Sequence, residues 1–317
     1  MPADGDGAPA GAVNGDGPPR VLCAGIIVLD EVFRVDEFPR NDGKVEATAF
    51  FAVNGGCAAN AAVAVARLGG RAILAGPLGG PAGTDENGDR VLAALGREAI
   101  DVGACQRVEG LKTALSAIFI NGRGERTIVT YRDSRIAAVT PHDPEALAGG
   151  ADIVLADNRF PQFVWPICEA ARRRGLRVVL DADKATAEDD PLFGVATHVI
   201  FSSECLAATT GRLDLAEALR AVARHTGAFL AVTNGADDIV FIEAGAVRHV
   251  PVFQVHAVDT LAAGDALHGG FALALAEGAK EAAALRFGAA VAGLKCTRIG
   301  GAGGMPRRAE VAALLAG

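Results

Sequence analysis

Short runs of aliphatic and β-branched residues alternate with stretches of helical spacing along most of this chain. The short runs lie at 21–28, 71–74, 153–156, 177–182, 198–201 and 229–233, and helical spacing occurs at 57–68, 162–174 and 213–225. Strands that are apolar throughout are typical of a sheet covered on both faces, and their alternation with helices is typical of parallel strands. The pattern therefore predicts an α/β fold, a three-layer open and mostly parallel sheet with helices on both faces.

Two segments, 32–53 and 113–131, do not fit this alternation. The second reads TALSAIFINGRGERTIVTY, two alternating runs around a Gly-containing turn, which predicts a β-hairpin. We interpret the two segments together as a small β-sheet that acts as a lid over a ligand cleft; a hairpin that only decorates the rim is the alternative. Residues 1–19 are rich in Gly, Pro, Asp and Ala and predict a disordered tail, which leaves 20–317 as one domain with this excursion.

The charge and the cysteines narrow the class of partner. The chain has 317 residues and a formal net charge of -8, which disfavours nucleic acids and anionic membranes but allows a small anionic ligand in a locally basic pocket. We expect neither a membrane span nor a signal peptide, since no apolar run is long enough and the first residues lack a basic start. Six scattered cysteines without a CxxC pair predict reduced thiols in the cytoplasm rather than a zinc site.

Asp265 follows Ala262-Ala263-Gly264 at the start of a predicted apolar helix, in the stretch DTLAAGDALHGG. Small residues leave backbone N–H groups uncovered, and at a helix start such donors form a site for an anion. A carboxylate beside this site suits phosphoryl transfer, in which a base accepts the proton of an attacking hydroxyl. The residues alone leave this role and that of a simple helix N-cap equally open for Asp265.

Two stretches resemble the signatures of the ribokinase-like (PfkB) carbohydrate kinases. DTLAAGD at 259–265 is similar to the C-terminal signature of the family, and GGCAAN at 55–60 is similar to its glycine pair followed by an Asn-bearing helix. The resemblance extends over 21–317. It implies a ribokinase-like fold, an ATP-dependent kinase that uses Mg2+, and a lid that covers the sugar and forms a homodimer. The GxxxxGK[ST] sequence of a P-loop does not occur, so that mechanism is excluded.

The resemblance assigns roles to individual residues. Asp265 would be the catalytic base, and the backbone N–H groups of Ala262, Ala263 and Gly264 would form the anion hole for the phosphoryl group. The residues expected to contact the sugar are Asp30, Gly55, Gly56 and Asn60, and those expected to contact the nucleotide are Thr233, Gly235, Asp259, Gly264 and Gly300. Plainer interpretations stay open for three of them: Asp30 as a turn cap, Asn60 as a polar residue within a helix, and Thr233 as an ordinary strand end.

One segment departs from the family pattern. Many members carry Asn-x-x-Glu after a central strand, where it helps to organise Mg2+ and the phosphates, whereas this chain has Ser202-Ser203-Glu204-Cys205. Glu204 stands one position early. For this reason no protein ligand is assigned to the metal, and a non-catalytic sensor of sugar or nucleotide on the same fold is a further alternative.

Within the family, the chain resembles the branch of ketohexokinase and sulfofructose kinase, in stretches such as GIIVLDEVFRVDEFP and LKCTRIGGAGGMP. These enzymes phosphorylate the C1 hydroxyl of a ketohexose. A sulfonate on C6 needs fixed positive donors, and the resemblance points to Lys44 and Arg159. Their plainer interpretation is a solvated surface charge. The expected substrate is 6-deoxy-6-sulfofructose, with fructose and the sugars of other PfkB kinases as alternatives.

Overall fold

The computed structural model describes residues 17–40, 42–123 and 125–317. The tail predicted for 1–19 therefore lies, up to residue 16, outside the described residues. Within the part of the chain that is described, no helix combines the length and the apolarity needed to cross a membrane.

The main sheet has eight strands, six of them parallel. These are β1 (Arg20–Ala24), β4 (Arg71–Ala75), β9 (Ile153–Asp157), β10 (Arg177–Ala182), β11 (His198–Ser202), β12 (Phe229–Asn234), β13 (Asp237–Glu243) and β14 (Ala246–Val250). Their order is β14-β13-β12-β11-β10-β9-β1-β4. All neighbouring strands pair parallel except at β13, which pairs antiparallel with both β12 and β14. The predicted open and mostly parallel sheet is confirmed, because these strands are apolar on both faces and need cover on both.

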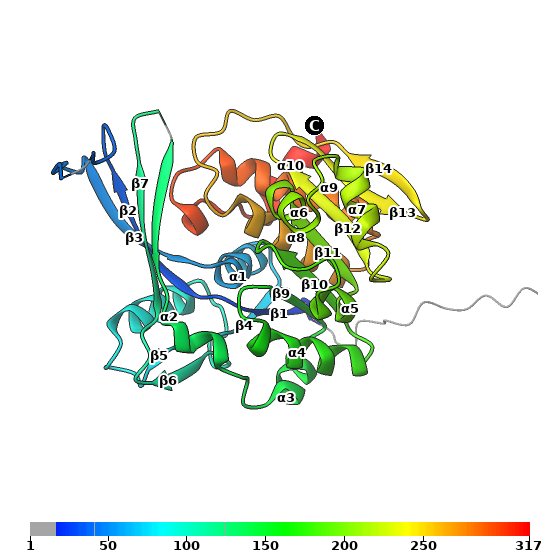
Figure 1. Cartoon of the computed structure of the whole chain (residues 1–317), viewed down its shortest axis with the longest axis horizontal. Helices are drawn as coiled ribbons and strands as arrows, with labels where there is room; N and C mark the ends of the chain where they lie inside the picture. Colours follow the sequence, from blue (N-terminus) through cyan, green and yellow to red (C-terminus); the bar gives the residue numbers. More distant parts are fainter. Residues whose placement is uncertain (1–16, 41, 124) are drawn as a thin grey trace, which may run out of the picture.

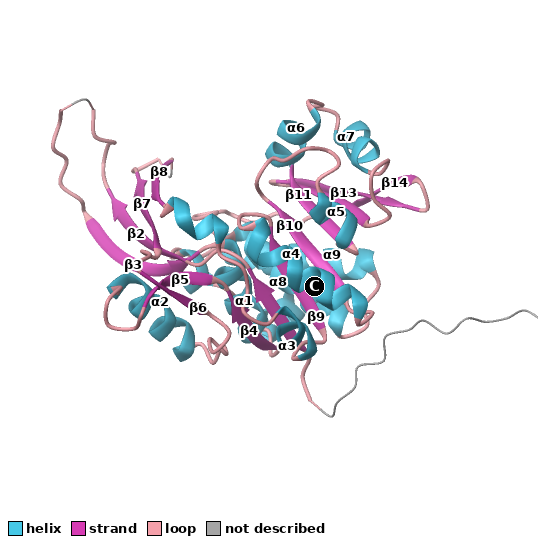
Figure 2. Ribbon diagram, turned by 60° about the horizontal axis from the view of Figure 1, so that its bottom comes forward, coloured by secondary structure: helices cyan, strands magenta, loops and turns pink. Residues whose placement is uncertain are grey.

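Helices cover both faces of the main sheet (Figures 1 and 2). One hydrophobic cluster includes residues of α1 (Cys57–Arg67), α2 (Glu86–Arg97), α8 (Ala263–Ala276), α9 (Glu281–Cys296) and α10 (Arg308–Ala316). The other includes residues of α3 (Pro144–Gly149), α4 (Pro161–Arg173), α5 (Pro191–Val195), α6 (Ser203–Thr210) and α7 (Leu215–Val222). Successive residues of β1 enter alternate clusters: Val21 and Cys23 the first, Leu22 and Ala24 the second. This is the side-chain alternation of a strand between two helical layers.

A second sheet of four strands stands apart from the main sheet (Figure 1). Its strands are β2 (Val28–Arg34), β3 (Ala49–Gly55), β7 (Ala114–Ile120) and β8 (Arg126–Tyr131), in the order β3-β2-β7-β8. We call it the lid sheet. A third, two-stranded sheet pairs β5 (Pro77–Gly80) with β6 (Gln106–Glu109), and two short 3-10 helices, η1 (Ser134–Ala138) and η2 (Gly301–Gly304), complete the described elements.

The run 21–28, predicted as one strand, is divided between two sheets. β1 ends at Ala24, and β2 begins at Val28 in the lid sheet. The break lies at Gly25, whose φ of 151° is open mainly to glycine, and a Cβ there would lie 2.0 Å from Oδ2 of Asp157. The lid sheet therefore begins before the predicted residue 32, and Asp30 lies within a lid strand rather than in a turn.

Candidate active site

Buried carboxylates gather at the carboxyl ends of β9 and β10. β1 lies between β4 and β9, so the strand order reverses here, and ligands of open α/β sheets bind at such a reversal. Asp157, only 1% exposed, ends β9, and its two oxygens accept the backbone N–H groups of Ile26 at 2.7 Å and Arg159 at 3.0 Å. Asp181 lies at the matching level of β10 and is also buried. These contacts join the ends of β1, β9 and β10 into one polar floor.

Asp265 lies in the first turn of α8 rather than at its N-cap. The N-cap position belongs to Ala262, which has a φ of 65° and whose side chain makes no capping bond. The plain capping interpretation of Asp265 is therefore wrong. Oδ2 of Asp265 instead accepts a 2.7 Å hydrogen bond from Nδ2 of Asn60 on α1. Oδ1 of Asn60 is buried without a partner among the described residues.

Burial shifts the proton affinity of Asp265. It raises the pKa of this carboxyl to about 7, the negative charge of Asp181 adds to the rise, and the hydrogen bond from Asn60 opposes it. Asp181, whose pKa burial also raises, approaches Asp265 closely: oxygens of the two carboxyls and Sγ of Cys57 lie within 4.8 Å of one another. A carboxylate whose pKa lies near neutrality is suited to accept a proton from a hydroxyl.

The turn before Asp265 offers backbone donors, although one predicted donor is already used. The N–H of Ala263 donates to the carbonyl oxygen of Thr260 at 3.2 Å, so it is not free for an anion. For the N–H groups of Ala262 and Gly264, no acceptor lies among the described residues. The positive φ of Ala262 turns this small-residue segment into the start of α8, where the helix dipole also favours an anion.

Asp259 and Gly300 hold this turn and do not line the apolar cavity described below. Oδ1 of Asp259 accepts the N–H of Leu261 at 2.8 Å, and Oδ2 accepts the N–H groups of Gly300 at 2.9 Å and Gly301 at 3.3 Å. Their expected contact with the nucleotide stays a prediction. Their hydrogen bonds fix the segment 259–264, which we call the anion loop.

An apolar cavity of about 250 Å³ adjoins the anion loop. Thr233 and Gly235 line it from the turn between β12 and β13, where Gly235 has a φ of 60°, and Ala263 lines it from the anion loop. The remaining wall is mostly apolar and includes Val252, Val255, Leu267, Ala289, Ala292 and Gly293. Apolar walls with a few polar groups suit a flat heteroaromatic ring, and from there phosphates would reach the start of α8.

None of the four residues predicted to contact the sugar, Asp30, Gly55, Gly56 and Asn60, lines this cavity. Asp30 of β2 is 6% exposed, and burial raises the pKa of its carboxyl to about 6, with a hydrogen bond from Ser116 in opposition. A Cβ at Gly55 would lie 2.0 Å from Oδ2 of Asp30, and one at Gly56 would lie 2.4 Å from the carbonyl oxygen of Ile26. The two glycines thus let α1 and β3 approach Asp30 and the end of β1.

The two cations predicted to bind a sulfonate are not brought together. Arg159 lies at the polar floor, where its guanidinium forms an ion pair with Asp183. Lys44 is exposed in the segment between β2 and β3, which extends away from the body of the molecule (Figures 1 and 2). Arg132, just after the lid strand β8, is the cation that lies near Arg159. Burial, together with the positive charge of nearby Arg159, lowers the pKa of the Arg132 guanidinium.

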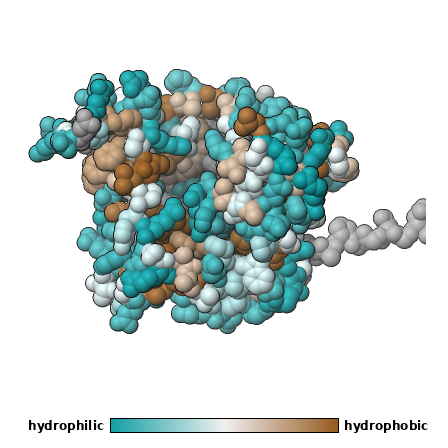
Figure 3. Space-filling model, in the orientation of Figure 1, coloured by the Kyte–Doolittle hydropathy of each residue, from teal (hydrophilic) through white to brown (hydrophobic). Residues whose placement is uncertain are grey.

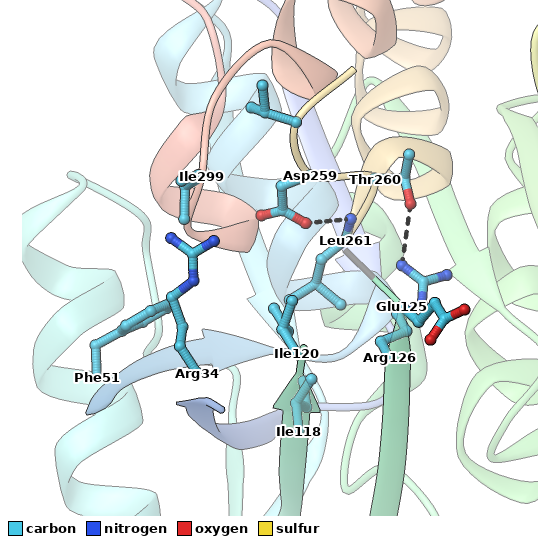
Figure 4. A pocket seen from close by; sticks show the side chains of 11 residues that line it. Arg34, Phe51, Ile118, Ile120, Glu125, Arg126, Asp259, Thr260, Leu261 and Ile299 are labelled. Atoms are coloured by element: carbon cyan, nitrogen blue, oxygen red, sulfur yellow. Dashed lines mark hydrogen bonds between the residues drawn. The ribbon is translucent and has the colours of Figure 1, made fainter. Parts of the chain in front are cut away.

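The lid sheet contacts the anion loop directly. Its inner face and the loop enclose a cavity of about 290 Å³, lined by Arg34, Arg126, Asp259, Thr260 and Leu261 among others (Figure 4). Nη1 of Arg126 donates to Oγ1 of Thr260 at 3.2 Å. A movement of the lid sheet would therefore change the position of the loop that precedes Asp265.

Sequence reasoning missed Asp157, Asp181 and Arg132. The first two had a usable signal, since each is an acidic residue at the end of a buried strand, where parallel strands meet at one edge. No local pattern marks Arg132. At the departing segment, Oγ of Ser202 accepts the N–H of Cys205 and caps α6, while Glu204 is exposed.

A loop of free N–H groups, a buried carboxylate beside it, an apolar cavity behind it and a lid in front define the class of phosphotransferases that act on a hydroxyl. The pattern of the pfkB family carbohydrate kinases matches residues 18–308, and the chain belongs to this family. It is a sugar kinase that uses ATP.

Ribokinases are prominent among the relatives. The chain is 29% identical to a ribokinase of Bacillus subtilis over 93% of this chain and 99% of that one. It is 31% identical to an ATP-dependent ribose-1-phosphate kinase of Halopiger xanaduensis over 80% and 83%. A crystal structure from Agrobacterium tumefaciens, assigned provisionally as a ribokinase, is 38% identical with a TM-score of 0.89 over 95% and 98%.

The narrower resemblance, to the ketohexokinase and sulfofructose kinase branch, does not stand out among these relatives. A mouse ketohexokinase is 27% identical over 87% of this chain and 96% of its own, no more than the ribokinase above. The family and the site do set aside the non-catalytic sensor.

Proposed function

We propose that this kinase transfers the γ-phosphoryl group of ATP to a primary hydroxyl of a sugar that also carries an anionic group. The substrate that fits the expectation from the sequence is 6-deoxy-6-sulfofructose, with its C1 hydroxyl as acceptor. The observation that carries the proposal is the position of Asp265 between the anion loop and the floor that holds Arg159, with Arg132 close by.

In the proposed reaction, Asp265 accepts the proton of the acceptor hydroxyl while the N–H groups of Ala262 and Gly264 hold the transferring group. Nδ2 of Asn60 donates to Oδ2 of Asp265 and so orients that carboxylate. Oδ1 of Asn60 would accept a hydrogen bond from the sugar. Asp30 would accept further sugar hydroxyls from the lid side. The lid sheet would exclude water from the reacting atoms.

Mg2+ fits this site as a companion of the nucleotide rather than as an ion in a protein cage. The cluster of Cys57, Asp181 and Asp265 offers a thiol among its three donors, whereas Mg2+ prefers oxygen ligands and is often held by phosphates with one or two carboxylates. When bound with ATP it would neutralise charge on the phosphates.

Two guanidiniums near one another favour an anionic substituent. Arg159 already pairs with Asp183, so a bound sulfonate or phosphate would share it with that carboxylate. No ion pair of Arg132 is found among the described residues, and the positive charge of Arg159 disfavours its charged form until an anion binds. The name of one relative, ribose-1-phosphate kinase, describes a sugar of this anionic kind.

A neutral pentose is the second candidate, because ribokinases match this chain over almost its whole length. In that case Asp30, Asn60 and Asp265 would suffice for recognition, and both arginines would serve the stability of the floor.

A coupled ATPase assay with Mg2+ separates the candidates. We would compare 6-deoxy-6-sulfofructose, fructose, fructose 6-phosphate, ribose, ribose 1-phosphate and adenosine, using the wild type, Arg132→Ala and Arg159→Ala. We expect the highest kcat/KM for an anionic sugar and a loss of about tenfold or more in each variant, the effect of a charge-assisted hydrogen bond. Arg173→Ala, on the exposed side of α4, is the control. A preference for ribose, unchanged in both variants, would establish the second candidate.

We further propose that the protein is a homodimer that associates through the outer face of the lid sheet. Phe33 packs between Phe50 and Phe119, with ring centroids 4.9 and 5.5 Å away. The register places Val129 and Tyr131 on the same face, and they are 61% and 53% exposed. Apolar side chains gather over this part of the molecule in Figure 3. An exposed apolar face of this kind typically marks an interface, and a second copy would supply the same surface.

A cytoplasmic location is also proposed. All six cysteines lie in the described residues and are free thiols, as expected in a reducing compartment.

A further inference from the structure

Lys295 is buried completely at the end of α9. Its side chain is 0% exposed, which is rare for a lysine. Nζ donates to the carbonyl oxygen of Asp259 at 2.7 Å and lies 3.2 Å from Oδ2 of the same residue. No role described so far uses this ammonium, although Asp259 opens the anion loop.

The surroundings of Lys295 suit a cation. The last turn of a helix favours positive charge, and Lys295 lies in the last turn of α9. Burial lowers the pKa of the ammonium, and the negative charge of Asp259 opposes this. The pKa of Asp259, which burial would raise, lies below its usual value because of the N–H of Leu261, the charge of Lys295 and the N–H groups of Gly300 and Gly301.

Further hydrogen bonds join the same two elements. The N–H groups of Val258 and Asp259 donate to the carbonyl oxygen of Cys296 at 2.8 and 3.2 Å. The segment that leads into the anion loop is therefore fixed to the end of α9 by its N–H groups, its carbonyl oxygen and its carboxylate. Lys295 supplies the positive charge in this arrangement.

We propose that Lys295 is a positioning residue whose ammonium acts as a built-in cation of the anion loop. It holds Asp259, and through the hydrogen bond from Leu261 the following turn, so that the N–H groups of Ala262 and Gly264 aim at the transferring phosphoryl group. The inference rests on the proposed phosphoryl transfer. Since donors stabilise a transition state only when they are aimed in advance, loss of the ammonium should lower kcat more than it raises KM.

Chemical rescue distinguishes this role from simple packing. Lys295→Ala leaves a carboxylate and a carbonyl oxygen without their cation, next to the space of the lost side chain. Ammonium or methylammonium ions fit such a space and supply the missing donor, whereas Lys295→Met fills it with an uncharged chain. We expect both variants to lose on the order of 100-fold in kcat, as for one oxyanion donor, and only the alanine variant to recover at least about tenfold with added amine.

The experiment measures kcat and both KM values for the wild type, Lys295→Ala and Lys295→Met, with and without methylammonium chloride, and sodium chloride as the salt control. Lys280→Ala, an exposed residue at the start of the same helix, controls for loss of surface charge. Wild-type turnover without amine tests the proposed function separately, since it does not depend on any variant.

A folded alanine variant without rescue, or a methionine variant with wild-type kcat, would overturn the proposal. Thermal unfolding of each variant shows whether it is folded. If Lys295→Ala does not fold, the near-isosteric Lys295→Met decides: a lower kcat with an unchanged KM for ATP supports the role, and an unchanged kcat refutes it.

Discussion

The amide nitrogen of Asn60 lies 2.7 Å from Oδ2 of Asp265, across 205 residues of sequence. The bond joins the first turn of α1 to the first turn of α8, two helices that begin within the two family signatures. It leaves the other oxygen of Asp265 for a substrate hydroxyl and lowers the pKa that burial has raised. The proposed base thus owes its orientation to one side chain, which also favours its deprotonated form.

Asp265→Asn removes the proton acceptor and keeps the shape. We expect kcat to fall by about 10²–10⁴-fold, the range for a positioned general base, while the affinity for ATP changes by no more than a few-fold. Steady-state kinetics and calorimetric titration with ATP measure the two effects. An unchanged kcat would exclude Asp265 as the base.

Asn60→Ala should move the acid side of the kcat profile to higher pH. The hydrogen bond from Asn60 lowers the pKa of Asp265, so its loss raises that pKa further above about 7. Because the base acts in its deprotonated form, activity should be lost most strongly below neutrality and recover in part at alkaline pH. A loss that is equal at every pH would mean that Asn60 only binds the sugar.

Asp181→Asn should have the opposite effect on the same profile. The negative charge of Asp181 raises the pKa of Asp265, so its removal lets the base ionise at lower pH. The variant should also be more stable at pH 7.5 than the wild type. Burial raises the pKa of Asp181 to about 7 in the folded state, whereas the pKa in the unfolded chain is about 3.9. Between these two pH values the unfolded chain loses its proton first, so the free energy of unfolding of the wild type decreases as the pH rises.

Thermal unfolding at pH 4.5 and 7.5 checks the second part. The gain in Tm of Asp181→Asn should be larger at pH 7.5, where the wild-type carboxyl is forced toward its charged form. A gain that is the same at both values, or a decrease only at pH 7.5, would contradict the assignment of burial as the cause.

Gly293→Leu should block the nucleotide. Gly293 lines the apolar cavity, and a Cβ there would lie 3.5 Å from Cβ of Phe253, so a longer side chain must enter the cavity. We expect the KM for ATP to rise by about tenfold or more, since adenine burial is lost, with the sugar KM nearly unchanged. Gly96→Leu, on α2 with open space around it, is the matched control. Equal effects in both variants would argue against a nucleotide in this cavity.

Val129→Lys should convert the proposed dimer into a monomer. Val129 is 61% exposed on the outer face of β8, so the charge does not disturb the fold of the monomer, whereas its burial in an interface is unfavourable. Light scattering after size exclusion measures the mass. Leu213→Lys, at an apolar residue outside the lid sheet that is 89% exposed, should leave the mass unchanged. A wild type that is monomeric at micromolar concentration would refute the interface.

The sequence by itself determined the layered α/β sheet, because strands apolar on both faces need helices on both. It also determined the family, because DTLAAGD and GGCAAN are local signatures whose residues meet at the Asn60–Asp265 bond. The division of 21–28 into two strands could not be read locally: it depends on Asp157, 131 residues from Ile26, whose carboxylate takes the space of a Cβ at Gly25.

Only the tertiary structure decided which charges face the site. Asp157 and Arg159 lie at the end of β9 and Asp181 lies near the end of β10, and the strand order is needed to see that these two ends are neighbours. No local pattern in the sequence distinguishes Lys44 from Arg132. In the fold, Lys44 is exposed in the segment between β2 and β3, whereas Arg132 lies near Arg159. Lys295 is hidden in the same way, since its role follows from a contact with Asp259 that no local pattern encodes. Charges act over distance in space, and distance in space is set by the fold.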